Sequence, residues 1–88
     1  MATLLDVTLS TSWMNVYSSR GLVGGEAITM QNKSSGAIIL YVGITAPVDD
    51  SGIIVNGNDF DMISITPFPY EFLFAKSVSG TGRIGIQR

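Results

Sequence analysis

The stretch that decides the fold runs Ala37-Ile38-Ile39-Leu40-Tyr41-Val42-Gly43-Ile44, the longest apolar run in the chain. Its length and its β-branched and aromatic residues predict a β-strand. Alternate residues of a strand point to opposite faces, so Ile38 and Leu40 share one face, while Ile39 and Tyr41 share the other. Neither face carries a charge, which predicts a central strand covered on both sides. We expect the Ile39 face to be covered by the N-terminal strands of this chain or, in part, by another subunit.

Short stretches of alternating or β-branched residues predict further strands on both sides of this run. They cover residues 3–9, 12–18, 27–32, 53–55, 61–66, 71–78 and 83–88. Gly, Pro and Asn-Gly signals separate them, and no segment has a helical period. We therefore predict one all-β domain over residues 1–88, a compact antiparallel β-sandwich or jelly-roll-like barrel of about seven to eight short strands.

Two connections are expected to be β-hairpins. One is the turn of residues 32–36, which leads into the central strand, and the other is the turn of residues 79–82 between the last two strands. The strands that these turns join are predicted to cover the Ile38 face of the central strand. The apolar residues of that cover would be Ile28, Met30, Ile63, Ile65, Phe72, Phe74, Ile84 and Ile86.

The first residues carry a looser strand pattern. Residues 1–10 are predicted to form an N-terminal arm or an edge strand, with Leu5, Val7 and Leu9 on one face. A charge such as Asp6 discourages open-ended pairing at a sheet edge. Because terminal strands often pair with a neighbouring subunit, residues 1–9 are also a candidate contact with a partner.

The composition excludes several kinds of chemistry. The chain has 88 residues with no Cys and no His, which excludes disulfides and thiolate metal sites and removes the commonest general base. Nucleophilic catalysis therefore lacks its base, and a carboxylate pair is the only catalytic option left. The candidate acids lie in loops or at strand starts, where solvated acids are usual: Asp49, Asp50, Asp59, Asp61 and Glu71. We predict neither enzyme activity nor a cofactor.

The charge content points to an assembly. Charged residues make up 14% of the chain, against roughly 25% in an average soluble domain. Lys and Arg total five without a cluster, so we expect no nucleic-acid partner. A domain of this size buries only roughly 60–65% of its unfolded surface, and oligomerisation is the reinforcement that this composition leaves open. We therefore expect a homo-oligomer or a component of a larger assembly.

The sequence also bears on location. The N-terminus lacks the basic region of a signal peptide, and no apolar run approaches the ~18 residues of a membrane helix. We expect no membrane contact, and a protein that is kept in the cytosol or released by a route other than secretion.

Six apolar or aromatic residues are candidates for contact with a partner. Trp13 is either a core anchor or a stacking platform, and we favour the anchor. Phe68, between two prolines, is either a lid over the core or an exposed contact. The full set is Trp13, Tyr17, Ile39, Tyr41, Phe68 and Tyr70.

One oxygen-rich stretch is a candidate calcium site. It runs Asn56-Gly57-Asn58-Asp59-Phe60-Asp61, which does not fit the spacing of an EF-hand loop. An Asn-Gly turn accounts for the stretch without an ion. We therefore predict a tight turn and no metal, with calcium near Asp59 and Asp61 as the alternative.

Three phrases in the chain resemble a known group of proteins. They are Gln31-Asn32-x-Ser34, a strand ending Val42-Gly43, and the stretch Ala75-x-Ser77-x-Ser79-Gly80-Thr81-Gly82-x-Ile84-x-Ile86. This order, over residues 26–88, is similar to that of small β-sandwich proteins of tailed-bacteriophage virions. Such modules serve as capsid decoration proteins, tail or baseplate accessories and fibre domains.

The resemblance implies a non-enzymatic virion structural protein, made in the host cytoplasm. Many copies would attach to a capsid or tail protein, as decoration, cement or a tail accessory. The alternative is a carbohydrate- or host-receptor-binding β-sandwich module. It would present Trp13, Tyr17 or Tyr70 beside Asp and Asn side chains.

Overall fold

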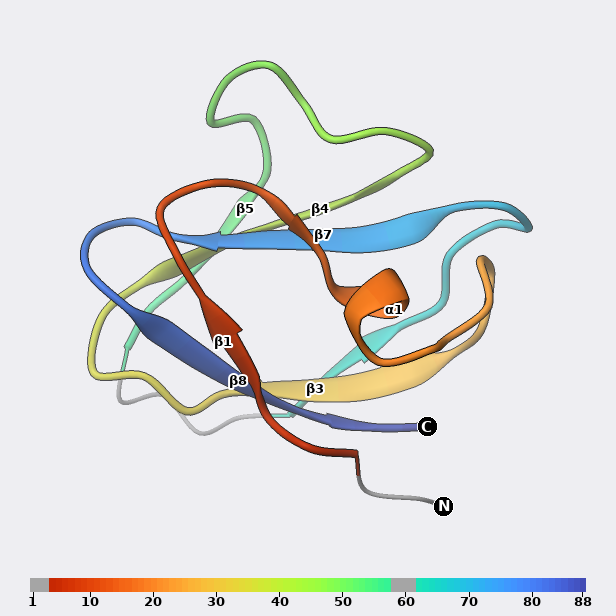
Figure 1. Cartoon of the computed structure of the whole chain (residues 1–88), viewed down its shortest axis with the longest axis horizontal. Helices are drawn as coiled ribbons and strands as arrows, with labels where there is room; N and C mark the ends of the chain where they lie inside the picture. Colours follow the sequence, from red (N-terminus) through yellow and green to blue (C-terminus); the bar gives the residue numbers. More distant parts are fainter. Residues whose placement is uncertain (1–3, 58–61) are drawn as a thin grey trace.

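The computed structural model describes residues 4–57 and 62–88, and within them it contains short strands and one helical turn (Figure 1). Four elements precede the central strand: β1 (Val7–Leu9), β2 (Met14–Asn15), α1 (Val16–Ser19) and β3 (Ile28–Asn32). The central strand is β4 (Ile38–Gly43), and it is followed by β5 (Ile53–Val55), β6 (Met62–Ile65), β7 (Phe72–Ser77) and β8 (Gly82–Gln87).

The strands form two antiparallel sheets that face each other. Sheet I has the order β1-β8-β3-β6, and sheet II has the order β2-β7-β4-β5. β1 pairs with β8, β2 with β7, β3 with β6 and β4 with β5, as in an antiparallel ribbon of eight strands folded onto itself. This is the jelly-roll arrangement. The predicted antiparallel β-sandwich is therefore confirmed, and the strand order identifies its jelly-roll form.

The core lies between the sheets, and the register shows which residues enter it. Leu40 lies opposite Ala75, and Val42 lies opposite Leu73. Opposite residues of an antiparallel pair point to the same face, so Leu73 and Ala75 join Leu40 in the core. The fully or nearly buried core side chains include Val7, Leu9, Ile28, Met30, Ile38, Leu40, Leu73, Ala75, Ile84 and Ile86.

The predicted core faces are correct for three strands and wrong for β7. Ile28 and Met30 of β3 and Ile84 and Ile86 of β8 are buried, and Ile63 and Ile65 of β6 pack against them. In β7, however, Phe74 is buried on the outer face of sheet II, and the half-buried Phe72 only borders the core. Both faces of β7 are apolar, so alternation alone did not show which of them faces inward.

Neither predicted hairpin is a hairpin. The turn after Asn32 connects β3 of sheet I to β4 of sheet II, and the turn after Ser77 connects β7 of sheet II to β8 of sheet I. Turn residues indicate that the chain reverses, but not whether the next strand stays in the same sheet. Among the described strands, consecutive ones pair in a single sheet only at β4 and β5, across the loop of residues 44–52.

A buried asparagine holds the first of these crossings in place. The side-chain amide of Asn32 donates to the carbonyl oxygens of Gly36, Val55 and Asn56 at 3.1–3.3 Å. Its side-chain oxygen accepts a bond from the Ser34 N–H at 2.9 Å. Asn32 is fully buried, so these bonds replace the water that it gives up on folding. They join the β3–β4 turn to the end of β5.

The N-terminal region forms less strand than predicted. The expected strand over residues 12–18 ends at Asn15, whose side-chain oxygen accepts the Ser18 N–H at 3.1 Å and caps α1. β1 is an edge strand of sheet I, as predicted for residues 1–10, and it buries Val7 and Leu9. Leu5 lies before the strand and is exposed, which the predicted face missed. Residues 1–3 lie outside the described residues.

Candidate docking surface

The sandwich has two lateral edges, and the one at β1 and β2 is closed by α1. The helix lies between the two layers in Figure 1, and Val16 and Tyr17 are both fully buried. The Tyr17 hydroxyl donates to the Glu26 carbonyl oxygen, and its ring meets Phe72 edge-on at 6.4 Å. Burial, followed by the Glu26 charge, raises the pKa of Tyr17 to about 12. We call this side the closed edge.

The opposite edge, between β5 of sheet II and β6 of sheet I, is open. An apolar groove of about 310 Å³ lies here. None of its described lining residues is charged. The lining residues are Leu40, Tyr41, Val42, Gly52, Ile53, Val55, Ile63 and Ile65. We call this side the open edge.

Large aliphatic side chains stand in solvent along the open edge. Ile53 is 72% exposed and borders the groove. Met62 at the start of β6 is 59% exposed but pairs with Gln31, so it points to the outer face of sheet I. Ile54 is 63% exposed but pairs with Ile39, so it points to the outer face of sheet II. β5 contains neither a charge nor a proline, the usual devices that protect an edge strand. An unprotected edge strand beside an apolar groove is a candidate interaction site.

The outer face of sheet II is covered within the chain around Ile39 and Tyr41. Trp13 is half-buried, donates its indole N–H to the Asp49 carbonyl oxygen at 2.9 Å, and meets Tyr41 edge-on at 6.4 Å. Lys76 lies 5.1 Å from the centre of the Trp13 ring and forms an ion pair with Asp50. The cover of the Ile39 face therefore comes from Trp13 and the loop of residues 44–52. The N-terminal segment contributes as predicted, but through one side chain rather than through strands.

Phe68 and Tyr70 stand on a tight turn, which we call the aromatic turn (residues 67–70). The Glu71 N–H donates to the Phe68 carbonyl oxygen at 3.0 Å, with Pro69 and Tyr70 at the two central positions. Tyr70 has φ of 68°, the left-handed value that a type II turn requires at this position and that glycine usually supplies. Phe68 and Tyr70 are 79% and 80% exposed. Phe68 is therefore exposed and does not form a lid over the core.

The aromatic turn is held firmly by its neighbours. The Glu71 carboxylate accepts the Phe68 N–H at 2.9 Å, and the Glu71 carbonyl accepts the Gly25 N–H at 2.8 Å. Gly25 has φ of 86°, and a Cβ there would lie 2.9 Å from the Pro69 Cα. The loop of residues 20–25 thus adopts backbone angles that favour glycine, with φ of 68° at Gly21 as well. That it supports the aromatic turn was not predicted, because no local pattern relates the two segments.

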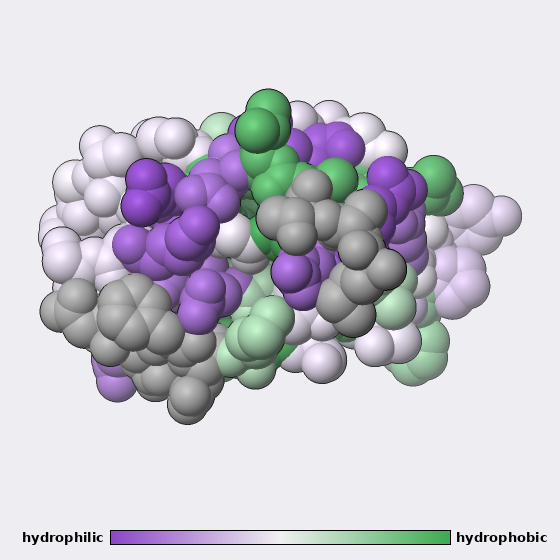
Figure 2. All heavy atoms as spheres, turned by 90° about the horizontal axis from the view of Figure 1, so that it is seen from below, coloured by the Kyte–Doolittle hydropathy of each residue, from purple (hydrophilic) through white to green (hydrophobic). Residues whose placement is uncertain are grey.

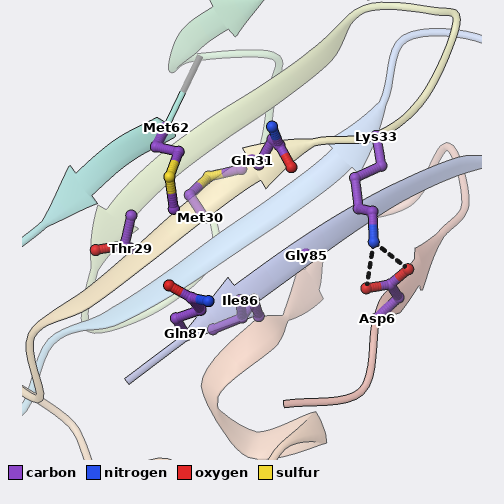
Figure 3. Close-up of a pocket in the computed structure, with 9 residues that line it drawn as sticks. All are labelled: Asp6, Thr29, Met30, Gln31, Lys33, Met62, Gly85, Ile86 and Gln87. Atoms are coloured by element: carbon purple, nitrogen blue, oxygen red, sulfur yellow. Dashed lines mark hydrogen bonds and ion pairs between the residues drawn. The ribbon is translucent and has the colours of Figure 1, made fainter. Parts of the chain in front are cut away.

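The outer face of sheet I is polar and slightly hollowed. Figure 2 views this side of the molecule and shows hydrophilic side chains gathered over part of it. A hollow of about 130 Å³ lies over β3 and β8. At one end Lys33 reaches Asp6 at 3.0 Å, and at the other stand Thr29 and Gln87, with Gly85 between them (Figure 3). Asp6 also pairs with Arg83 at 3.4 Å, so the edge strand β1 is flanked by charge, as predicted.

The six predicted contact residues do not form one site. Tyr17 and Ile39 are buried and so present no surface to a partner, which corrects their assignment. Trp13 and Tyr41 pack on each other over sheet II, and Phe68 and Tyr70 project from the aromatic turn. The groove residues of β5 and β6 were missed as a contact, because their exposure depends on which strands end each sheet.

Acidic residues in the described part of the chain are solvated or already paired. Hydrogen bonds from the Ser51 hydroxyl and N–H hold the pKa of the exposed Asp49 below its usual range. Glu26 pairs with Arg88 at 2.9 Å. Among residues 4–57 and 62–88, no group of three or more His, Cys, Asp or Glu side chains could hold a metal ion. The calcium alternative at Asp59 and Asp61 lies outside the described residues.

Comparison of the chain with protein-family models, with curated proteins and with solved structures gave no match. The described part of the chain contains no helix that is long and apolar enough to span a membrane. Jelly rolls occur in viral capsid domains, lectin domains and cupins, so this fold alone does not select a function.

Proposed function

We propose that the chain is a non-enzymatic structural protein of a tailed-bacteriophage virion. Many copies attach to a capsid or tail protein, as decoration, cement or a tail accessory. The observation that carries this proposal is the open edge, where an apolar groove and the exposed Ile53 lie on one side of the sandwich. A partner that covers this edge removes the exposed apolar surface from water.

The energetic gain from such a contact is substantial for a small domain. Full burial of an exposed Ile, Val or Met side chain contributes about 1.5–3 kcal/mol. The open edge offers Ile53, with Val42 at the groove wall. The whole chain has 14% charged residues, so little charge opposes its attachment to another protein. These features suit a protein that is stabilised by assembly.

The direct test is to locate the chain in particles. Tailed-phage particles are purified from cells that produce this protein and are imaged by cryo-electron microscopy. We expect many ordered copies on the capsid or tail, with β5 and β6 facing a neighbouring protein. Particles that lack the chain, or copies attached with β5 and β6 facing solvent, would contradict the proposal.

The polar hollow on sheet I supports the alternative function, binding of a carbohydrate or a host receptor. Thr29, Gln31 and Gln87 bring hydroxyl and amide groups to it, and these groups suit sugar hydroxyls. The aromatic residues predicted for this function lie elsewhere: Trp13 packs over sheet II, Tyr17 is buried, and the exposed Tyr70 stands on the aromatic turn. A glycan array with the wild type and Gln87→Ala tests this alternative. Signals that survive the substitution, or the absence of signals, would count against it.

A further inference from the structure

We propose that Asn56 is a site of spontaneous deamidation, which the fold protects as long as the corner at the end of β5 stays closed. Asn56 is the only asparagine of the chain that is followed by glycine. Glycine has no side chain to hinder its own backbone nitrogen, so this pair closes into a ring more readily than other asparagine pairs. Such a covalent change is independent of the proposed function.

The reaction needs only water. The deprotonated backbone nitrogen of Gly57 attacks the side-chain amide carbon of Asn56, and the amide nitrogen takes up a proton from water and leaves as ammonia. Water then opens the succinimide ring at one of its carbonyl carbons. Opening at the main-chain carbonyl gives isoaspartate, whose main chain runs through the former side chain and is longer by one atom. Opening at the other carbonyl gives aspartate.

The folded chain holds the peptide plane between Asn56 and Gly57 by two contacts. The amide of the buried Asn32 donates to the Asn56 carbonyl oxygen at 3.1 Å. The Gly57 backbone lies so close to the β3–β4 turn that a Cβ on it would overlap the Ser35 carbonyl oxygen. Ring closure needs a backbone conformation outside the broad allowed regions, so this plane has to rotate. Both contacts oppose the rotation and thereby protect the pair.

The protection depends on a corner that opens locally. Asn56 is exposed, so water has access to it, and it directly follows β5. Among the described strands, β5 has only β4 as a neighbour. Opening of such an edge costs less free energy than unfolding of the whole domain. We therefore expect the folded chain to react through opening of this corner.

The isoaspartate product does not fit the closed corner. Its extra main-chain atom lies between Val55, whose carbonyl oxygen accepts the Asn32 amide at 3.3 Å, and Gly57. No space remains for a longer chain there, because Gly57 already lies against the Ser35 carbonyl. The isoaspartate chain therefore loses contacts that hold β5, whereas the aspartate product keeps the normal main-chain length.

Deamidation rates test the protection. The full chain is kept in mildly alkaline buffer and digested, and the acid form of the peptide that contains Asn56 is quantified by mass spectrometry. The folded wild type should form it at least about tenfold more slowly than the chain unfolded in guanidinium chloride. Asn32→Ala removes one of the two contacts and should raise the rate of the folded chain by about tenfold.

Ser34→Ala is the matched control. Ser34 lies in the same turn, but its hydroxyl is bonded to the backbone of Arg83 in β8. Its rate should stay close to that of the wild type, and equal acceleration by Ser34→Ala and Asn32→Ala would overturn the role of the Asn32 bond. Equal rates in the folded and the unfolded wild type would overturn the protection, even if Asn32→Ala does not fold. An unfolded chain that keeps the Asn56 amide would overturn the site itself.

A second experiment tests the effect of the product. The isoaspartate form is separated by chromatography and identified by labelling with a protein-isoaspartate methyltransferase. Hydrogen exchange in residues 53–55 should be faster in this form than in the wild type. Asn56→Asp carries the same charge on a normal main chain and should exchange like the wild type. An isoaspartate form that keeps the wild-type protection of β5 would overturn the effect on the corner.

Discussion

The two lateral edges of this jelly roll contain similar apolar side chains but treat them differently. At the closed edge, the turn of helix after β2 places Val16 and Tyr17 between the sheets, where both are fully buried. At the open edge the described residues form no such helix, and Ile53 stands 72% exposed beside a groove. The difference shows that apolar content alone does not separate a core from a contact surface. The presence of a covering element decides between them.

The largest expected effect on stability comes from a substitution of a buried residue at the closed edge. Tyr17→Ala removes a fully buried ring and leaves a cavity between the sheets. We expect the free energy of unfolding to fall by about 3–5 kcal/mol, which urea denaturation would measure. Tyr17→Phe is the matched control and should cost about 1 kcal/mol, because it loses only the hydrogen bond to Glu26. Equal losses for the two variants would show that packing of the ring is not what closes this edge.

The next effect concerns the corner that holds β5 at the open edge. Asn32→Ala leaves the buried turn without the bonds to Gly36, Val55 and Asn56. We expect a loss of about 2–3 kcal/mol and faster hydrogen exchange in residues 53–55. Asn56→Ala is the control, since its side chain is exposed and its bonded carbonyl belongs to the backbone. Protection of β5 that survives Asn32→Ala would contradict this role.

The closed edge should also respond to alkaline pH. The pKa of Tyr17 is about 12 in the folded chain, against 10.0 for an ordinary tyrosine. Below pH 10 the residue is neutral in both states, and its full contribution to stability is present. As pH rises from 10 to 12 the unfolded chain ionises first, so stability is lost, by roughly 2 kcal/mol in total. Urea denaturation at several pH values measures this slope, and a slope unchanged in Tyr17→Phe would exclude Tyr17 as its source.

A smaller effect is expected at the aromatic turn. Tyr70 holds a left-handed φ that glycine adopts without strain. Tyr70→Gly should therefore raise the free energy of unfolding by about 0.5 kcal/mol, after the higher chain entropy of glycine is offset. Thermal melts would detect the gain. A loss of stability would mean that the exposed Tyr70 ring contributes to folding.

The fold could largely be predicted from alternation and turn signals. The apolar faces of β3, β6 and β8 were predicted correctly, because in each of them one face is apolar and the other mostly small or polar. The β7 face was not, since Phe72 and Phe74 alternate with Leu73 and Ala75 and both faces are apolar. The two turns that were predicted to be hairpins connect strands of different sheets, and local sequence could not show this either. Local sequence determines a reversal, whereas the choice of sheet depends on the whole strand order.

The candidate docking surface was less predictable. The exposed Phe68 and Tyr70 were named from their place beside prolines, and both proved accessible. The Ile53 edge was not named, because Ile53-Ile54-Val55 has the composition of a buried strand. Its exposure follows from the position of β5 at the end of sheet II, beside only β4 among the described strands. That position is a property of the topology and leaves no local signature.

The open edge as a docking surface is tested most directly by the number of copies per particle. Particles grown with the wild type, Ile53→Lys or Ile54→Lys are purified and quantified by mass spectrometry. Both substitutions lie at exposed positions and should change the free energy of unfolding by less than about 0.5 kcal/mol. We predict that Ile53→Lys is lost from the particles while Ile54→Lys is retained. A folded Ile53→Lys chain that is present at the wild-type copy number would contradict the account.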